Sequence, residues 1–478
     1  MLFPTTSFAI FFAAVFTAHW MLSRFPTRWR VFMTGASYFF YAWWDWRLVW
    51  LLAASTIVSQ VAALGIHRTD HAGRRRLAMA GGVTGNLVLL CGFKYYGFFA
   101  LSLDNALHGV GLGSALPLVQ MTLPVGISFY TFMGISYVVD VYRRDTEPAP
   151  WLDFIVYHSF FPHLVAGPIV RARELIPQIQ RRRDPRSIDV AGAAYLIWGG
   201  LFKKVVLSSF LASAIVDPVF GAPGEHSALE ILVAVYAYAV QIYADFSGYT
   251  DMAIGVAMLL GFRLPQSFDA PYTARSLREF WRRWHMTLSR WLRDYLYVPL
   301  GGSRGSRART YRNVLITMAL GGLWHGAAWT FVAWGLLHGV GLAAGRWREA
   351  RAAAGGLGAG RPAWRPASLH PALQRAATFH FVCLGWLLFR ADSLHTVGTM
   401  LARLVTAWGP APAVTPLVLL AVGFGIGVQY TPEDLPERVE SAFARAGALA
   451  QGVALGVLLF VISALGPQGV APFIYFRF

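Results

Sequence analysis

The sequence predicts an all-α, polytopic membrane protein, in which a bundle of transmembrane helices forms one integral-membrane domain over residues 1–478. Three observations lead to this fold class. Hydrophobic residues make up 56% of the chain and charged residues only 14%, whereas a soluble domain carries roughly 25% charged residues. The mean hydropathy is +0.47. Apolar runs recur along the chain, and many approach the length of about 20 residues that a helix needs to cross a bilayer.

The apolar runs define the expected elements in order. Candidate membrane segments lie near residues 5–23, 31–44, 48–66, 77–100, 120–139, 153–170, 190–216, 228–244, 251–262, 313–322, 327–345, 376–389, 413–430 and 446–466. Several are short, and 31–44, 153–170 and 313–322 are candidates for re-entrant segments or for halves of a broken helix. Irregular backbone at membrane depth survives only inside protein or beside a wet cavity. We therefore expect about 11 full crossings plus re-entrant segments around an internal passage.

The first apolar run and the charge pattern fit this interpretation. The run that ends near residue 22 lacks the basic start of a secretory signal and is longer than the apolar core of one, so we expect a retained transmembrane helix. The formal net charge of +17 comes mostly from arginines in short loops between apolar runs. The positive-inside bias and anionic headgroups explain that pattern, and no nucleic-acid recognition motif accompanies it. The charge thus predicts membrane lipids, and not nucleic acid, as partners.

A histidine stands in a stretch without formal charge that runs from Asn313 to Gly345. On a continuous helix, Gly321 and Trp329 lie one turn before and one turn after His325 on the same face. The glycines of this stretch allow another backbone to approach closely. Burial without a counter-charge disfavours imidazolium, so His325 would be the neutral imidazole that a general base must be. The alternative interpretation is a histidine that bridges two helices through a hydrogen bond.

A second histidine lies in the segment 276–302, which predicts an amphipathic helix. Ser276 and Glu279 form the pattern of a capping box at its start. On a helical wheel, His285 and several tryptophans share the apolar face, and most arginines take the opposite side. His285 would then point into the protein or the membrane. Two interpretations stay open: a core histidine bonded to a backbone carbonyl, or a functional histidine.

Two acidic residues, Asp245 and Asp251, lie where two apolar runs meet, and Ser247 and Gly248 suggest a helix break between them. An acid at this depth needs a partner, and the arginines of residues 278–293 are the expected supply. A structural ion pair is the favoured role of Asp245, with substrate contact as the alternative.

The remaining histidines do not form a metal site in the sequence. His338 follows His325 by 13 residues, about 20 Å further along a continuous helix and turned by about 220°, so the two cannot share a site unless the helix breaks. We expect His338 to be interfacial. His158 and His163 are a poor metal pair because no nearby carboxylate completes it. Phosphate-loop, serine-hydrolase and zinc-protease motifs are absent, so we expect no metal and no bound cofactor.

Seven stretches together resemble the membrane-bound O-acyltransferase family, and within it the branch that acetylates alginate. They are LPVGISFYTFMGISYVVDVYR (123–143), FFPHLVAGPIVR (160–171), QIYADFSGYTDMAIG (241–255), FWRRWHMTLSRWLRDYLYVPLGG (280–302), GGLWHGAAWTFVAWGLLHG (321–339), FHFVCLGWLLFRAD (379–392) and FIYFRF (473–478). The resemblance implies a ring of helices around a membrane-spanning tunnel. It places the near-invariant histidine of the family on His325 and its second histidine on His285.

The resemblance also implies a reaction. We expect a multi-pass O-acetyltransferase of the bacterial inner membrane that takes acetyl from cytoplasmic acetyl-CoA and serves the O-acetylation of an exported polysaccharide, alginate. His325 and His285 are the expected catalytic residues, and Trp324, Trp329 and Asp245 the expected substrate-binding residues. Periplasmic proteins that receive or transfer the acetyl group and the exopolysaccharide machinery are the expected partners. Sister enzymes that act on peptidoglycan, cellulose or teichoic acid, and a non-enzymatic transporter of lipid-linked sugar, stay open as alternatives.

Overall fold

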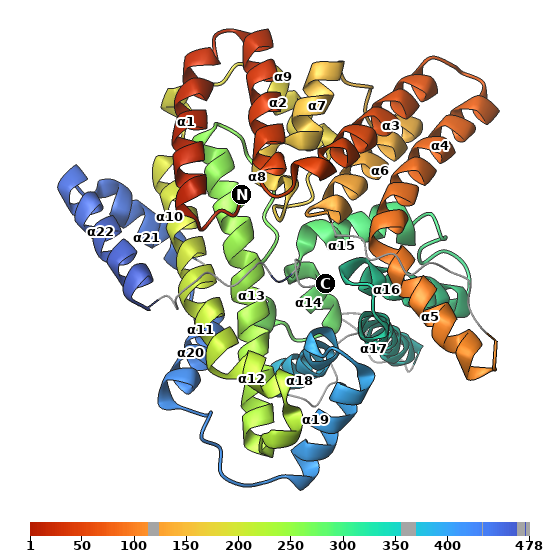
Figure 1. Cartoon of the computed structure of the whole chain (residues 1–478), viewed down its shortest axis with the longest axis vertical. Helices are drawn as coiled ribbons and strands as arrows, with labels where there is room; N and C mark the ends of the chain where they lie inside the picture. Colours follow the sequence, from red (N-terminus) through yellow and green to blue (C-terminus); the bar gives the residue numbers. More distant parts are fainter. Residues whose placement is uncertain (113–123, 355–369, 433, 466–473, 475–478) are drawn as a thin grey trace. The chain divides into compact units, whose positions relative to one another are not determined.

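The computed structural model describes residues 1–112, 124–354, 370–432, 434–465 and 474. Within these ranges the regular structure consists of α-, 3-10 and π-helices (Figure 1), so the prediction of an all-α fold is confirmed. The chain forms two compact units, one of residues 1–197 and 252–265 and the other of residues 198–251 and 266–478. The two helices α10 (Val190–Leu201) and α13 (Ala228–Leu259) each contribute residues to both. The prediction of a single domain stays a prediction.

The first unit contains nine further α-helices in its described part. They are α1 (Thr6–Leu22), α2 (Pro26–Ala42), α3 (Val49–His67), α4 (Ala72–Leu90), α5 (Tyr96–Gly109), α6 (Ile127–Arg143), α7 (Trp151–Ser159), α8 (Phe161–Leu164) and α9 (Ala172–Gln180). Helices α3, α4 and α6 pack side by side (Figure 1). Gly82 on α4 makes this possible, because a side chain there would meet Ala62 of α3 and Val138 of α6.

A buried polar network joins three helices of the first unit. The side chain of Asn86, on α4, accepts a hydrogen bond from Ser55 Oγ at 2.6 Å and donates one to Ser59 Oγ at 3.0 Å, both on α3. Ser55 Oγ also lies 3.1 Å from His158 Nε2 on α7. His163 Nε2 lies 3.0 Å from the Tyr157 carbonyl oxygen. Both histidines thus form hydrogen bonds within the first unit.

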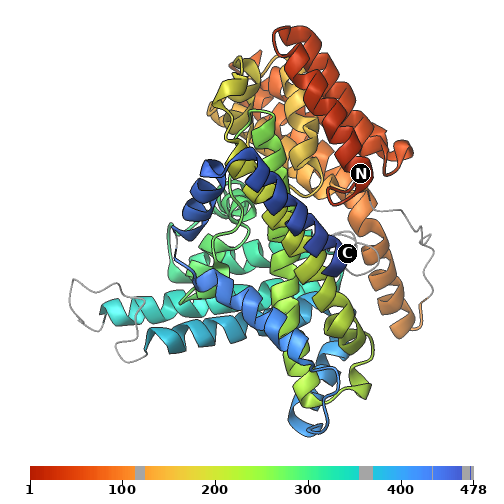
Figure 2. The same cartoon turned by 90° about the vertical axis from the view of Figure 1, so that its left-hand side faces the viewer.

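The second unit contains a helical hairpin and the helices packed around it. Its further α-helices are α11 (Ser209–Leu211), α12 (Asp217–Gly221), α14 (Leu277–Arg283), α15 (Met286–Leu292), α16 (Arg307–His325), α17 (Trp329–Ala354), α18 (Pro371–Arg390), α19 (Leu394–Thr406), α20 (Pro416–Gly427), α21 (Leu435–Arg445) and α22 (Ala448–Leu465). Helices α16 and α17 pack along each other as a hairpin, and Figure 2 shows α17 and α18 side by side.

Glycines set the close packing of the hairpin. A side chain at Gly322 would overlap the carbonyl oxygen of Phe331, and one at Gly335 would overlap the carbonyl oxygen of Met318. The sequence predicted such a close approach for the glycines before His325, and the structure confirms it for Gly322. Small residues at such crossings let two backbones approach each other in a membrane bundle.

Five helical segments in the described part are long and apolar enough to cross a membrane. They cover Trp46–His67, Ala72–Gly109, Val190–Gly221, Ala228–Leu259 and Pro371–Arg390. Three shorter apolar helices lie at Thr6–Leu22, Pro416–Tyr430 and Leu449–Ser463. These are fewer than the expected crossings, because several predicted segments are short or interrupted helices. The segment 153–170, for example, is divided between α7 and α8, which meet at Phe160 just before Pro162.

Two predicted details of the second unit are wrong. The segment 276–302 is not one amphipathic helix, because the backbone leaves the helical conformation at Trp284 and His285, between α14 and α15. Helix α13 continues through Ser247 and Gly248 without a break. The cap at the start of α14 follows the prediction, since Ser276 Oγ accepts from the amide of Glu279 at 3.2 Å.

Candidate active site

His325 is the last residue of α16 and lies in an aromatic pocket of the second unit. Its exposed fraction is 3%. The ring centroid of His325 lies 5.0 Å from that of Trp324, 5.0 Å from that of Trp334 on α17 and 5.2 Å from that of Phe389 on α18. Helix α16 ends at this point, because Gly326 adopts an extended backbone and a side chain there would overlap the ring of Phe331. The chain reversal therefore surrounds the imidazole with rings from three helices.

The chain reversal after His325 changes the neighbours that the sequence predicted for this residue. Trp324 is buried, as predicted, with an exposed fraction of 3%. Trp329 was expected one turn further along the same helix, but it begins α17 and is 56% exposed. Trp334, whose exposed fraction is 1%, takes the place next to the imidazole that the sequence had given to Trp329. A continuous helix was the wrong assumption, because the segment Gly326–Ala328 is irregular.

His285 is fully buried and its backbone lies in the left-handed region, with φ 40° and ψ 55°. This region is unfavourable for a residue with a side chain, and such strain is found most often at functional sites. The ring centroid lies 4.6 Å from that of Phe246 on α13 and 6.3 Å from that of Phe268. Nδ1 is 3.5 Å from Thr287 Oγ1. No described group forms a hydrogen bond with Nε2.

Burial lowers the pKa of His285 to about 3, because an imidazolium there would lose its hydration. The residue lies outside the apolar spans given above and is a neutral imidazole at physiological pH. A neutral imidazole offers one donor and one acceptor nitrogen. The sequence suggested that a purely structural histidine would bond to a backbone carbonyl. Within the described part of the chain, His285 forms no such hydrogen bond.

Trp324 connects the two histidines that the sequence singled out. Its ring centroid lies 6.2 Å from that of His285 and 5.0 Å from that of His325. His285 comes from the junction of α14 and α15, and His325 comes from the end of α16. The fold therefore places both imidazoles against one buried indole. The two residues are 40 positions apart (325 − 285) in the chain, and the sequence did not predict that they lie close together.

Asp245 is buried on α13 and forms an ion pair with Lys204. The carboxylate also lies 3.3 Å from Ser208 Oγ and accepts the backbone amide of Ile474 at 2.9 Å. The ion pair was predicted, but its partner was not: Lys204 of the π-helical segment Phe202–Ser208 supplies the charge, and not the arginines of residues 278–293. The neighbouring Asp251 forms an ion pair with Lys203. These contacts form the kind of ion pair that the sequence favoured for Asp245.

His338 was expected to be interfacial, and this prediction is wrong. It is fully buried on α17, 4.9 Å from Trp334 and 5.4 Å from Trp281 between ring centroids. Because the helix breaks after His325, both His325 and His338 contact the same ring, that of Trp334. The spacing of Trp334 and His338, four residues apart on a helix, was the signal in the sequence that could have identified this pair.

Comparison with known proteins identifies the family. The model of the membrane-bound O-acyltransferase family matches residues 36–349, a range that includes both His285 and His325. The chain belongs to the membrane-bound O-acyltransferase family. It is therefore an O-acyltransferase, and the apolar helices described above make it a multi-pass membrane protein.

Relatives with similar sequences have names that refer to different acceptors. The chain is 36% identical to "Probable alginate O-acetylase AlgI" of Azotobacter vinelandii over the full length of both chains. It is 34% identical to "Peptidoglycan O-acetyltransferase" of Helicobacter pylori, over 85% of this chain and 80% of that one. It is 30% identical to "Teichoic acid D-alanyltransferase" of Streptococcus thermophilus, over 46% of this chain and 55% of that one. These names refer to three different polymers: alginate, peptidoglycan and teichoic acid.

Proposed function

We propose that this O-acyltransferase transfers acetyl groups from a thioester donor, acetyl-CoA in the cytoplasm, for the O-acetylation of an exported polysaccharide, with alginate as the polymer and the inner membrane as the location. The full-length similarity to the alginate O-acetylase of Azotobacter vinelandii supports the polymer. The shorter match to the D-alanyltransferase supports teichoic acid less well.

The contact of His285 and His325 with the same buried indole is the observation that carries this proposal. Trp324 brings the two imidazoles together from different elements. Indole and phenyl rings surround both imidazoles, so water is largely excluded from the two histidines. Exclusion of water suppresses hydrolysis of a reactive thioester and strengthens the hydrogen bonds made there.

His325 acts as the general base in the proposed reaction. A neutral imidazole nitrogen takes the proton of the acceptor hydroxyl while its oxygen attacks the thioester carbonyl. The carbon–oxygen bond of the new ester forms, the carbon–sulfur bond breaks, and the same proton passes to the leaving thiolate. General acid–base assistance of this kind contributes about 10²–10⁴-fold to a rate.

His285 supplies a hydrogen bond to the reacting groups in this scheme. When Nδ1 accepts from Thr287 Oγ1, Nε2 carries the proton and can donate to the oxygen that becomes negative during attack. Trp324 fixes the spacing of the two rings and is the proposed substrate contact. The exposed Trp329 and the ion-paired Asp245 remain weaker candidates for substrate binding.

The test uses the full chain in proteoliposomes with acetyl-labelled thioester donor. We expect His325→Ala to reduce thiol release and labelled product by 10²-fold or more, and His285→Ala to reduce both to a similar extent. His395→Ala, on the exposed face of α19, is the matched control and should retain full activity. Full activity of a folded His325→Ala variant would refute the general-base role.

The acceptor is tested separately with purified polymers. Label should appear on alginate in the presence of the periplasmic partner proteins, and its transfer to peptidoglycan or teichoic acid in place of alginate would refute the assigned polymer. Release of thiol in these assays with no acetylated product would refute the transfer step.

A further inference from the structure

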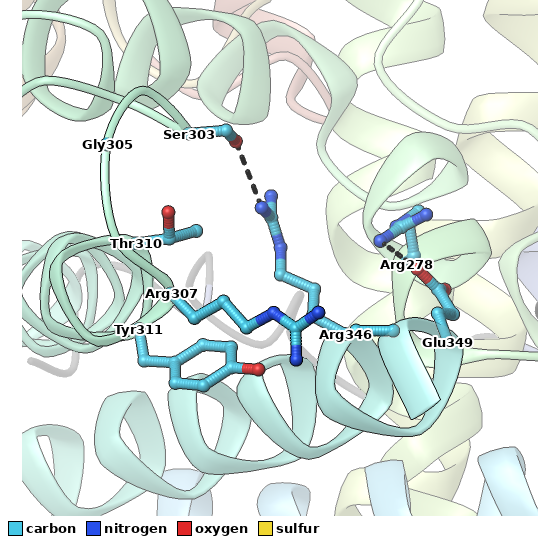
Figure 3. Close-up of a pocket in the computed structure, with 9 residues that line it drawn as sticks. Arg278, Ser303, Gly305, Arg307, Thr310, Tyr311, Arg346 and Glu349 are labelled. Carbon is cyan, nitrogen blue, oxygen red and sulfur yellow. Dashed lines mark hydrogen bonds and ion pairs between the residues drawn. The ribbon is translucent and has the colours of Figure 1, made fainter. Parts of the chain in front are cut away.

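A cavity of about 410 Å³ lies in the second unit at the start of α16 (Figure 3). Side chains from three helices and one loop line it. Among them are Arg278 of α14, Ser303 of the loop before α16, Arg307 and Thr310 of α16, and Arg346 and Glu349 of α17. These residues define the arginine pocket. None of them belongs to the aromatic pocket around His325, which lies at the other end of α16.

The arginine pocket carries a net positive charge. Arg278, Arg307 and Arg346 give three positive charges and Glu349 one negative charge, which leaves +2 (3 − 1). Glu349 is engaged by Arg278, with Arg278 Nη2 2.7 Å from Glu349 Oε2. Within the ranges that the structure describes, no carboxylate forms an ion pair with Arg307 or Arg346. Figure 3 shows both guanidinium groups extending into the space between the loop and the helices.

Of the two uncompensated arginines, Arg346 is held by its neighbours, and Arg307 is exposed at the start of α16. Arg346 Nη1 donates to Ser303 Oγ at 3.0 Å, and the guanidinium lies 5.6 Å from the ring centroid of Tyr297. Arg307 is the first residue of a 19-residue helix, where unpaired backbone amides and the helix dipole also favour a negative charge. The hydroxyl groups of Thr310 and Tyr311 add hydrogen-bonding capacity to the lining. This arrangement brings two arginines and several hydroxyl groups to one cavity, where an anion with several oxygen atoms could contact them together.

We propose that the arginine pocket binds a phosphate group. Planar guanidinium groups match the oxygen geometry of phosphate in bidentate contacts, and a phosphate monoester carries the two negative charges that balance the lining. Two sources supply a phosphate group at a membrane surface: the phosphate monoester of a soluble acyl donor, and the phosphodiester headgroup of an anionic phospholipid, which carries one negative charge. The soluble source is the donor of the proposed acetyl transfer, so that arm rests on the proposed function, whereas the lipid arm does not.

The test measures binding to the purified full chain in a neutral detergent. The soluble probe is adenosine 3′,5′-bisphosphate, and the lipid probe is phosphatidylglycerol in mixed micelles with that detergent, compared with phosphatidylcholine in the same micelles. Arg307→Gln and Arg346→Gln should each lower the affinity for the probe about 10-fold or more, because each removes one charged hydrogen bond. Arg348→Gln is the matched control, because Arg348 is exposed on α17 and does not line the pocket.

Each outcome decides the proposal. Binding of the bisphosphate that falls in both variants and not in the control supports a soluble phosphate ester. Binding of phosphatidylglycerol alone, with the same dependence, supports a lipid headgroup. Equal binding by wild type and both variants overturns the proposal, as does an equal loss in Arg348→Gln.

Two further measurements separate this site from folding and from catalysis. Affinity of the wild type should fall as salt is raised from low to high concentration, and the fall should be smaller in Arg346→Gln, because screening acts on the charges removed. His325→Ala should bind the phosphate probe as the wild type does. Loss of activity in that variant with intact phosphate binding would show that the two sites are independent.

Discussion

His285 combines full burial with a backbone conformation that a side chain makes unfavourable. A left-handed residue other than glycine costs about 1–3 kcal/mol, and the neighbouring structure must supply that energy. Glycine or asparagine would relieve the strain at this position. The retention of a histidine despite this cost fits a role for the imidazole itself, next to Trp324 and His325.

The lowered pKa of His285 predicts a specific dependence of stability on pH. The folded protein holds the neutral form down to about pH 3, whereas the unfolded chain binds a proton near pH 6.5. Stability is therefore complete above about pH 6.5 and falls by about 1.4 kcal/mol per pH unit below it, until the folded pKa is reached. His285→Phe should flatten the profile between pH 6 and 4, as measured by thermal unfolding in detergent.

The control for this experiment is His395→Phe, which changes an exposed histidine of the same unit. Its profile should match that of the wild type. A slope in His285→Phe as steep as in the wild type would mean that protonation of other groups governs acid unfolding, and the neutral state of His285 would lose its support.

At the scale of elements, the α16–α17 hairpin depends on glycines at its contact line. Gly335→Ala places a methyl group against the carbonyl oxygen of Met318 and should destabilise the protein by about 1–3 kcal/mol through overpacking. Gly345→Ala is the matched change on the same helix, where nothing lies within 4 Å, and it should be neutral or stabilising by up to about 1 kcal/mol. Thermal unfolding of both variants tests the difference, and equal effects would contradict it.

The ion pair of Lys204 and Asp245 connects the π-helical segment to α13. Asp245→Asn leaves a buried ammonium without its counter-charge, and breaking such a pair costs about 3–5 kcal/mol. Asp251→Asn provides the comparison, because the Lys203–Asp251 pair is more exposed and should cost less.

A double variant tests this explanation of the ion pair. Lys204→Met combined with Asp245→Asn should be more stable than Asp245→Asn alone, since no charge is then left unpaired. A double variant as unstable as the sum of its single changes would argue against a charge-based cause.

At the scale of the whole molecule, acetyl transfer should separate the two products in space. In sealed, inside-out membrane vesicles supplied with labelled thioester outside, free thiol should accumulate outside and labelled acetyl inside. Only the small acyl group needs to cross if the proposed passage exists. Labelled product on the outer side alone, with the vesicles intact, would contradict transfer across the membrane.

Much of the fold class was predictable because it depends on composition. Long apolar runs with few charges fix helices in a bilayer, where each backbone group must be satisfied within its own segment. Both catalytic candidates could also be identified, because a histidine in an uncharged or tryptophan-rich stretch is costly without a role. That both rings contact Trp324 was not part of that reasoning and is a finding of the structure.

The surroundings of these residues were not predictable, because they depend on where helices end. A helical wheel assumes continuity, and the chain leaves the helix at His285 and again at Gly326. The second break replaces Trp329 by Trp334 beside His325 and buries His338. Lys204 was overlooked as the partner of Asp245 because the pair is formed between segments 41 residues apart (245 − 204).

Helix α16 has Arg307 of the arginine pocket at its first residue and His325 at its last. The 18 steps between them, at about 1.5 Å each, span about 27 Å along the axis. The length of the helix thus fixes the distance between the arginine pocket and His325. A donor that contacted both at once would have to be an elongated molecule. Truncated thioesters would contact only the imidazole of His325. Activity measured with a series of donors of increasing length would therefore report the distance between the two sites.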